Sequence, residues 1–504
     1  MFRILTFPLR LVWNILVVLV PLIGVWVASS LTAYLNGPIW AACLVGALLF
    51  PVLPLAWEWR ANAKRRRKLD ASDTGDKEPK RWLGFWDRVT LRTLFLNVAF
   101  LGILLASFPA KGFTALSTRG DWMLQGDQSE RAETVRQGLF QAANGLAWLH
   151  ELATDNPFER YDDGSSKGIE PAPNPVPIKP DVGVPEEPVG TEEPARTPSP
   201  VDTTPEKREP GEVPAWPMRA ELHPVVANFP AEHETSIESV AKYIASQEPD
   251  PFLRVKALHD YVADRVSYDI AALRRGDYPP QDEETVFRTR MAVCAGYATL
   301  LVKMGEHTGD EIVYVAGNSR GENGQVAGGG HAWNAAKIEG RWYLLDATWS
   351  AGYVNGSTFT KSYSTANLFT PPEVFVHDHL PDNSSWQLLE TPITQGEFVR
   401  QPMMKARFFA KGYELLSPRR SQISVSGDGV ELEIKSKRHI PMIAQITPRG
   451  ADASTQGVRC EVNGLDLIKV SCETPTPGQY TVWLFSKDKG VTYGLVGHLE
   501  VNRS

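Results

Sequence analysis

Three residues in the second half of the chain carry the groups that a thiol acyl-transfer enzyme needs. Cys294, His331 and Asp346 lie in the strings VCAGYATLL, GGGHAWNAAKI and WYLLDATW. In such an enzyme a thiolate attacks the carbonyl carbon of an amide, an imidazole moves the proton, and a carboxylate orients the imidazole. A single residue of any of these types is more often structural, so the hypothesis depends on whether the chain brings the three together.

The sequence between His331 and Asp346 predicts a hairpin that makes these two side chains neighbours. The string IEGR at residues 338–341 is typical of a two-residue turn between apolar, aromatic runs. This register places Trp333 opposite Asp346. His331 then faces Thr348, and His331 and Asp346 become diagonal neighbours on one face of the sheet. A slip of one residue would put them on opposite faces.

The segment that begins at Cys294 predicts a helix, because apolar residues recur at helical spacing and no proline interrupts them. The unpaired N–H groups and the dipole of a helix N-terminus favour a thiolate, and a nearby imidazolium favours it further. The same N–H groups can bind an oxyanion. We therefore expect Cys294 to be an accessible nucleophile, His331 its base and then its acid, and Asp346 the group that holds the imidazole in its productive tautomer.

At these positions the chain resembles the transglutaminase-like superfamily, a papain-like group whose triad runs Cys, His, Asp. The strings VSYDI, VCAGYA, GHAWN and LLDATW, and the trailing PPEVFVHDHLPDNSSWQLL, are similar to its kyphoscoliosis peptidase branch. The resemblance implies an α+β, papain-like fold over residues 216–395. It also implies that Cys294, His331 and Asp346 form the catalytic triad.

Runs without charged residues predict three membrane spans. They cover residues 11–35, 37–57 and 93–110, and a helix needs about 20 apolar residues to cross a bilayer. We therefore expect two transmembrane helices in residues 1–58 and a third in residues 91–110. The third run is the shortest, and it could instead lie along one leaflet.

Basic residues are concentrated in the loop that we expect over residues 59–90. They are Arg60, Lys64, Arg65, Arg66, Arg67, Lys68, Lys77, Lys80 and Arg81. Because basic loops stay on the cytoplasmic side, this loop and the N-terminus are predicted to be cytoplasmic, and everything after the third span extracytoplasmic. A basic run can also bind nucleic acid, but beside two spans we expect no nucleic-acid partner.

The remaining chain divides by composition. Residues 127–153 predict an amphipathic helix, which either self-associates near the membrane or folds back on its own domain. Its expected apolar stripe consists of Val135, Leu139, Ala142, Leu146 and Leu149. Residues 154–215 are rich in proline and predict a disordered linker. Short alternating strands in residues 396–504 predict an all-β, Ig-like sandwich of about seven strands.

The other cysteines and histidines leave two questions open. Cys460 and Cys472 lie in neighbouring strand-like runs, so they are either a disulfide or two reduced core thiols. His377, Asp378 and His379 crowd one turn, but no further His or Cys cluster completes a ligand set. We therefore expect neither a metal nor a cofactor.

Together these patterns predict a membrane-anchored enzyme that acts on amide or peptide bonds through a thioester. It would be a protease or amidase, or a protein cross-linker, and its substrates would be proteins or peptides, including those of the cell envelope. The alternative is a non-catalytic membrane scaffold whose papain-like and sandwich domains bind protein or cell-envelope partners. The presence of all three triad residues favours the enzyme.

Overall fold

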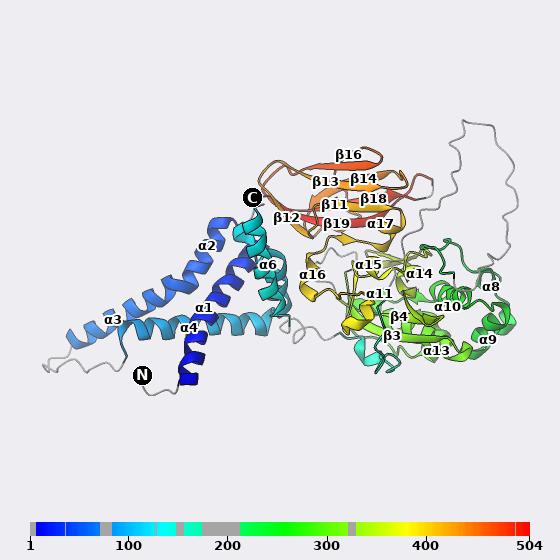
Figure 1. The fold of residues 1–504 in the computed structure, drawn as a ribbon, viewed down its shortest axis with the longest axis horizontal. Coiled ribbons are helices and arrows are strands. Elements are labelled where there is room, and N and C mark those ends of the chain that lie inside the picture. Colours follow the sequence, from blue (N-terminus) through cyan, green and yellow to red (C-terminus); the bar gives the residue numbers. More distant parts are fainter. Residues whose placement is uncertain are drawn as a thin grey trace.

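The protein consists of an N-terminal group of helices, a mixed α/β domain and a C-terminal β-sandwich (Figure 1). The computed structural model describes residues 7–35, 37–70, 83–124, 127, 129–147, 156–173, 212–320, 329–488 and 490–503. The predicted fold class, α+β with preceding apolar helices and a following β domain, is confirmed.

The N-terminal helices include three stretches that are long and apolar enough to cross a membrane: Val12–Tyr34, Trp40–Arg67 and Phe85–Ser107. The elements are α1 (Phe7–Tyr34), α2 (Ile39–Ala47), the π-helical η1 (Leu48–Val52), α3 (Leu53–Asp70) and α4 (Phe85–Ser107). The predicted loop over residues 59–90 needs a correction, because α3 continues to Asp70 and α4 already begins at Phe85. Lysine, arginine and alanine are good helix formers, so the helix outlasts the apolar run.

Two further helices, α5 (Pro109–Arg119) and α6 (Glu130–Asn144), connect this group to the rest of the protein, with η2 (Trp122–Leu124) between them. In α6, Phe140 and Ala143 are buried, whereas Val135, part of the predicted apolar stripe, is exposed. The guanidinium carbons of Arg400 and Arg420 lie 4.3 and 5.3 Å from the Phe140 ring centroid. The helix therefore packs on its own chain, and with a different face from the predicted one.

The α/β domain is built on a five-stranded antiparallel sheet with the order β8-β5-β4-β3-β9. Its strands are β3 (Glu311–Ser319), β4 (Gly329–Ile338), β5 (Arg341–Leu345), β8 (Leu368–Thr370) and β9 (His379–Pro381). The β4–β5 turn contains Glu339 and Gly340, both with positive φ (51° and 80°), as a type I′ turn requires. The ladder runs from Ile338↔Arg341 to Asn334↔Leu345, which confirms the predicted register.

Helices cover one face of this sheet and form its main core. The long helix α13 (Cys294–Thr308) packs directly on β3 and β4, and α9 (Ile237–Gln247) and α10 (Pro251–Arg265) pack around it. Asp250 caps α10 by accepting hydrogen bonds from two backbone N–H groups, and Pro251 occupies its first position. The smaller elements are η3 (Glu159–Tyr161), α8 (Pro224–Ala227), η4 (Ala231–His233), β1 (Ser267–Tyr268), α11 (Ile270–Arg275), α12 (Glu283–Thr289), β2 (Met291–Ala292), α14 (Ala347–Ala351), β6 (Gly352–Asn355), β7 (Thr358–Lys361), α15 (Pro372–Phe375), η5 (Ser384–Gln387), α16 (Gln395–Arg400) and α17 (Ala406–Ala410).

The C-terminal domain is a sandwich of a six-stranded and a four-stranded sheet. Its strands are β10 (Met403–Met404), β11 (Tyr413–Ser417), β12 (Gln422–Val425), β13 (Gly429–Ser436), β14 (Met442–Pro448), β15 (Val458–Arg459), β16 (Glu461–Asn463), β17 (Leu467–Glu473), β18 (Gly478–Lys487) and β19 (Tyr493–Arg503). This is more than the seven strands that we expected, because short edge strands such as β10 and β15 have no clear alternating pattern. Alternate residues of both sheets form the core, among them Leu432, Val470 and Val482.

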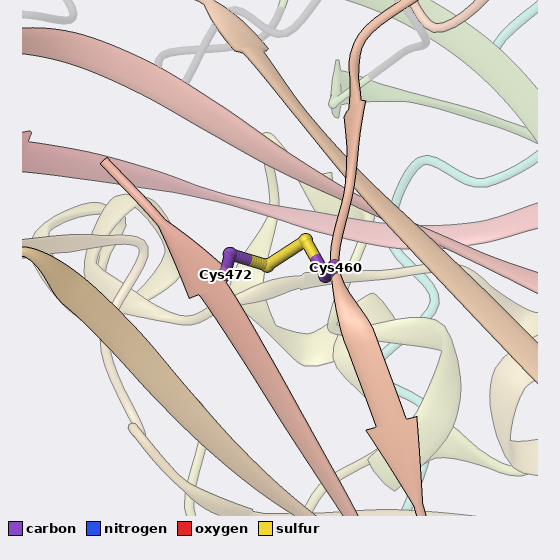
Figure 2. Close-up of a disulfide and its surroundings, with 2 residues drawn as sticks. All are labelled: Cys460 and Cys472. Carbon is purple, nitrogen blue, oxygen red and sulfur yellow. A yellow bond between two sulfur atoms is a disulfide. The ribbon is translucent and has the colours of Figure 1, made fainter. Parts of the chain in front are cut away.

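The sandwich contains a disulfide between Cys460 and Cys472 (Figure 2). Cys472 lies on β17, and Cys460 lies between β15 and β16. Of the two alternatives left open by the sequence, the structure therefore has the bridge. Disulfides persist mainly in oxidising compartments.

Candidate active site

His331 and Asp346 meet at the end of the β4–β5 hairpin. The Nε2 atom of His331 lies 2.7 Å from Oδ2 of Asp346. The strand ladder ends at Leu345, and Asp346 caps α14 by accepting the backbone N–H of Trp349 at its Oδ1 atom, 3.0 Å away. The expected opposition of His331 and Thr348 is therefore wrong, because the chain turns into a helix after Asp346. The pairing of imidazole and carboxylate does not depend on it.

Cys294 is the first residue of α13, and Val293 is the N-cap. A hydrogen bond between the side chains of Cys294 and His331 is one of the interactions that raise the pKa of His331. Because Nε2 of His331 faces Asp346, Nδ1 is the ring nitrogen left for the thiol. The structure thus brings together all three residues that the sequence singled out.

The electrostatics of this group favour a charged imidazole. Burial lowers the pKa of His331, but the charges of Asp346 and Cys294 outweigh it and raise the pKa to about 9. Burial raises the pKa of Asp346, but His331 and His379 outweigh that effect and hold it well below its usual range. At neutral pH, His331 is therefore an imidazolium paired with a carboxylate.

A second histidine contacts the same carboxylate. Nε2 of His379 lies 3.1 Å from Oδ2 of Asp346, and its Nδ1 lies 2.7 Å from Oδ1 of Asp378. Burial lowers the pKa of His379, but the charge of Asp378 and the hydrogen bonds to both carboxylates raise it to about 9. In the sequence, His379 stood out only as a candidate metal ligand. The pairing of β9 with β3, which brings His379 to the site, links distant segments and leaves no local pattern.

Of the three residues that crowd one turn, His377 packs its ring on Phe409 with the centroids 4.6 Å apart, whereas His379 reaches Asp346. The ligand atoms of His331, Asp346 and His379 do lie within 4.8 Å of one another. A metal ion there would take the nitrogen and the oxygen through which His331 and Asp346 pair. A metal and a working triad therefore exclude each other at this position.

Cys294 is buried, with 1% of its surface exposed, so the expectation of an accessible thiol is wrong. It lies in an apolar cluster with Phe158, Tyr314 and Ala332. Phe158 belongs to the described segment 156–173, so the predicted linker over residues 154–215 needs a correction at its beginning. Proline-rich composition starts only near residue 171, and the aromatic side chains before it provide apolar surface to bury.

Comparison with known proteins agrees with this geometry. Residues 238–347, which include Cys294, His331 and Asp346, match the transglutaminase-like superfamily. The chain is 31% identical over 250 residues to the kyphoscoliosis peptidase of Mus musculus and 32% identical over 250 residues to that of Homo sapiens. It is also 27% identical over 134 residues to Hillarin of Drosophila melanogaster, a match that covers 23% of this chain and 16% of Hillarin.

Each kyphoscoliosis peptidase match covers 48% of this chain and 37% of the relative, so the chain spans little more than a third of those proteins. Residues 238–347 thus form a domain of the transglutaminase-like superfamily, and the chain is similar in this branch to the kyphoscoliosis peptidases.

Proposed function

We propose that this protein is a membrane-anchored thiol acyl-transfer enzyme that acts on amide or peptide bonds of proteins. One observation carries the proposal. A free cysteine begins helix α13 and is close enough to the imidazole of His331 to raise its pKa, and Nε2 of that imidazole lies 2.7 Å from a fully buried carboxylate. Residues that are far apart in the sequence rarely converge in this way for packing alone.

In the first half-reaction, the Cys294 thiolate attacks the carbonyl carbon of the substrate amide, and the carbonyl oxygen becomes an oxyanion. The backbone N–H groups at the start of α13 are suited to stabilise this charge. The His331 imidazolium then gives its Nδ1 proton to the departing amine as the C–N bond breaks. The products are a free amine and a thioester on Cys294.

In the second half-reaction, the now neutral His331 removes a proton from the acceptor as it attacks the thioester. The C–S bond breaks, and Cys294 leaves as a thiolate beside the re-formed imidazolium. Water as the acceptor gives a carboxylic acid and net hydrolysis, whereas a primary amine gives a new amide and net cross-linking. Both outcomes use the same residues.

His379 acts as a positioning residue in this scheme. It contacts the same carboxylate oxygen of Asp346 as His331 does, while the Trp349 N–H group donates to the other oxygen. Its positive charge also offsets part of the Asp346 charge, so the pKa of His331 stays low enough for proton release.

Two features support an extracytoplasmic location for the domain. Tyr34, at the end of α1, contacts Arg449 and Gln479 of the sandwich, and α5, which follows α4, packs on α16. The ends of the first and third spans then lie on the same side of the membrane, as three crossings require. The Cys460–Cys472 bridge also fits an oxidising compartment.

The enzyme and the scaffold interpretations are separated by the activity of the purified protein, unchanged and as Phe158→Ala. It should release fluorescent peptides from a labelled, denatured protein, or attach a fluorescent primary amine to that protein. Cys294→Ala should abolish both reactions. Signals from the unchanged chain and from Phe158→Ala that both equal the signal from Cys294→Ala would leave the scaffold as the better account.

A further inference from the structure

The segment that covers Cys294 is held mainly by the strands that carry the site. Asn156 donates its Nδ2 hydrogens to the carbonyls of Gly317 and His331, 2.9 and 3.2 Å away, and so bridges β3 and β4. Gly330 allows this approach, because a Cβ there would lie 2.7 Å from Oδ1 of Asn156 and 2.8 Å from Cδ of Pro157.

Phe158 belongs to the buried cluster that contains Cys294. Its side chain is buried, and its ring lies 5.1 Å from that of Tyr278. Its carbonyl accepts the Tyr314 hydroxyl hydrogen at 2.8 Å. The segment thus combines a backbone contact, which any polypeptide can make, with one aromatic side chain in a pocket.

The chain passes Phe158 as a turn rather than as an extended strand. Phe158 has right-handed helical φ and ψ (−96° and −12°), and η3 follows it directly. The segment therefore buries the Phe158 side chain beside Cys294 without presenting an extended peptide for cleavage.

Resting on the proposed function, we propose that residues 156–161 occupy the substrate groove of the resting enzyme. The segment is an internal competitor, and it identifies the substrate class as polypeptides that place an aromatic side chain in the pocket of Tyr278 and Cys294. Activity then requires a substrate or partner that displaces it. Because the segment is part of the same chain, its effective concentration at the groove is high, and a free peptide competes only when the segment is weakened.

The test uses the full chain with Cys43→Ser, which removes the other free thiol of the described residues. Alkylation of Cys294 by iodoacetamide is followed by mass spectrometry across pH in four forms: this parent, Phe158→Ala, Asn156→Ala, and Lys167→Ala as a control. Lys167 is exposed on the same segment. Phe158→Ala should speed alkylation at least about tenfold, because a buried phenyl ring supplies most of the apolar contact that closes the groove.

Asn156→Ala should speed alkylation in the same direction, and Lys167→Ala should match the parent. Asn156 is only half-buried, so its replacement tests the proposal if Phe158→Ala lowers thermal stability. A capped hexapeptide with the sequence of residues 156–161 should slow alkylation of Phe158→Ala, and the same peptide with alanine in place of phenylalanine should not.

The outcomes separate the two proposals. Fast alkylation at neutral pH in both the parent and Phe158→Ala would contradict the proposal that residues 156–161 block the groove, but it would agree with a reactive thiolate at Cys294. Slow alkylation in all four forms, rising only near the pH of an ordinary thiol at about 8.5, would overturn the proposed function itself.

Discussion

His379 approaches the same carboxylate oxygen of Asp346 that pairs with His331, at 3.1 Å against 2.7 Å. One oxygen of Asp346 therefore binds two histidines: His331, the candidate catalytic base, and His379, which positions the carboxylate. Both nitrogens of His379 face carboxylates, which favours the cationic form of the ring. This positive charge opposes the effect of Asp346 and lowers the pKa of His331.

His379→Gln keeps an N–H for Asp346 but removes the charge. The pKa of His331 should then rise from about 9, so the alkaline limit of the pH–rate profile should move upward. The ring centroids of His331 and His379 are 5.4 Å apart, and a unit charge at this separation corresponds to a shift of roughly two pH units at an effective dielectric constant of about 20. His377→Gln, on the same turn but away from the triad, should leave the limit unchanged. A lower rate with an unmoved limit would mean that His379 is only structural.

Asp346→Asn should lower the chemical step by roughly a hundredfold to ten-thousandfold, because the amide no longer stabilises the imidazolium and can stabilise the wrong tautomer. Its Oδ1 atom can still accept the Trp349 N–H that caps α14, so the thermal midpoint should change little. Single-turnover kinetics and thermal unfolding of the same preparation measure the two effects. Loss of folding with Asp346→Asn would make the carboxylate a structural group.

Stability should fall at alkaline pH. His331 and His379 both have folded pKa values raised to about 9, above the unfolded value of about 6.5. Their contribution to the free energy of unfolding is therefore complete below about pH 6.5 and is lost as the pH rises through about 9. The pKa of Asp346 is lowered by folding, so its contribution to the free energy of unfolding is lost on acidification instead.

Unfolding midpoints from pH 6 to 10 should fall less for His379→Gln than for the unchanged chain. Parallel curves would contradict the charged form of His379.

The sequence was most informative where function depends on local geometry. Residues 338–341 predicted the turn, the turn fixed the register, and the register brought His331 next to Asp346. The helix that begins at Cys294 was also predictable from spacing. The positions of His379 and Phe158 were not predictable from the sequence. His379 is placed by the pairing of β9 with β3, and Phe158 by the packing of segment 156–173 on β3, and both contacts join segments that are far apart in the chain. The prediction of which face of α6 is buried was wrong, because the cation–π contacts of Arg400 and Arg420 favour burial of Phe140 rather than of the apolar stripe.

Topology can be tested through the proline-rich residues 174–211, which lie outside the described residues. Protease added to intact cells or spheroplasts should cut the chain there, because three crossings place this stretch outside. The Cys460–Cys472 bridge should resist alkylation until a reductant is added. If cutting needs a permeabilised membrane, the third apolar helix does not cross the bilayer, and the enzyme is cytoplasmic.

The central claim is that Cys294 forms a thioester with the help of His331. The most direct measurement mixes the full chain, unchanged and as Phe158→Ala, with p-nitrophenyl acetate, stops the reaction with acid, and identifies acetylated residues by mass spectrometry. We predict a burst of about one p-nitrophenolate per active chain, with the acetyl group on Cys294. The burst should be lost in Cys294→Ala and strongly slowed in His331→Ala. An acetyl group absent from Cys294 in both the unchanged chain and Phe158→Ala would contradict the account.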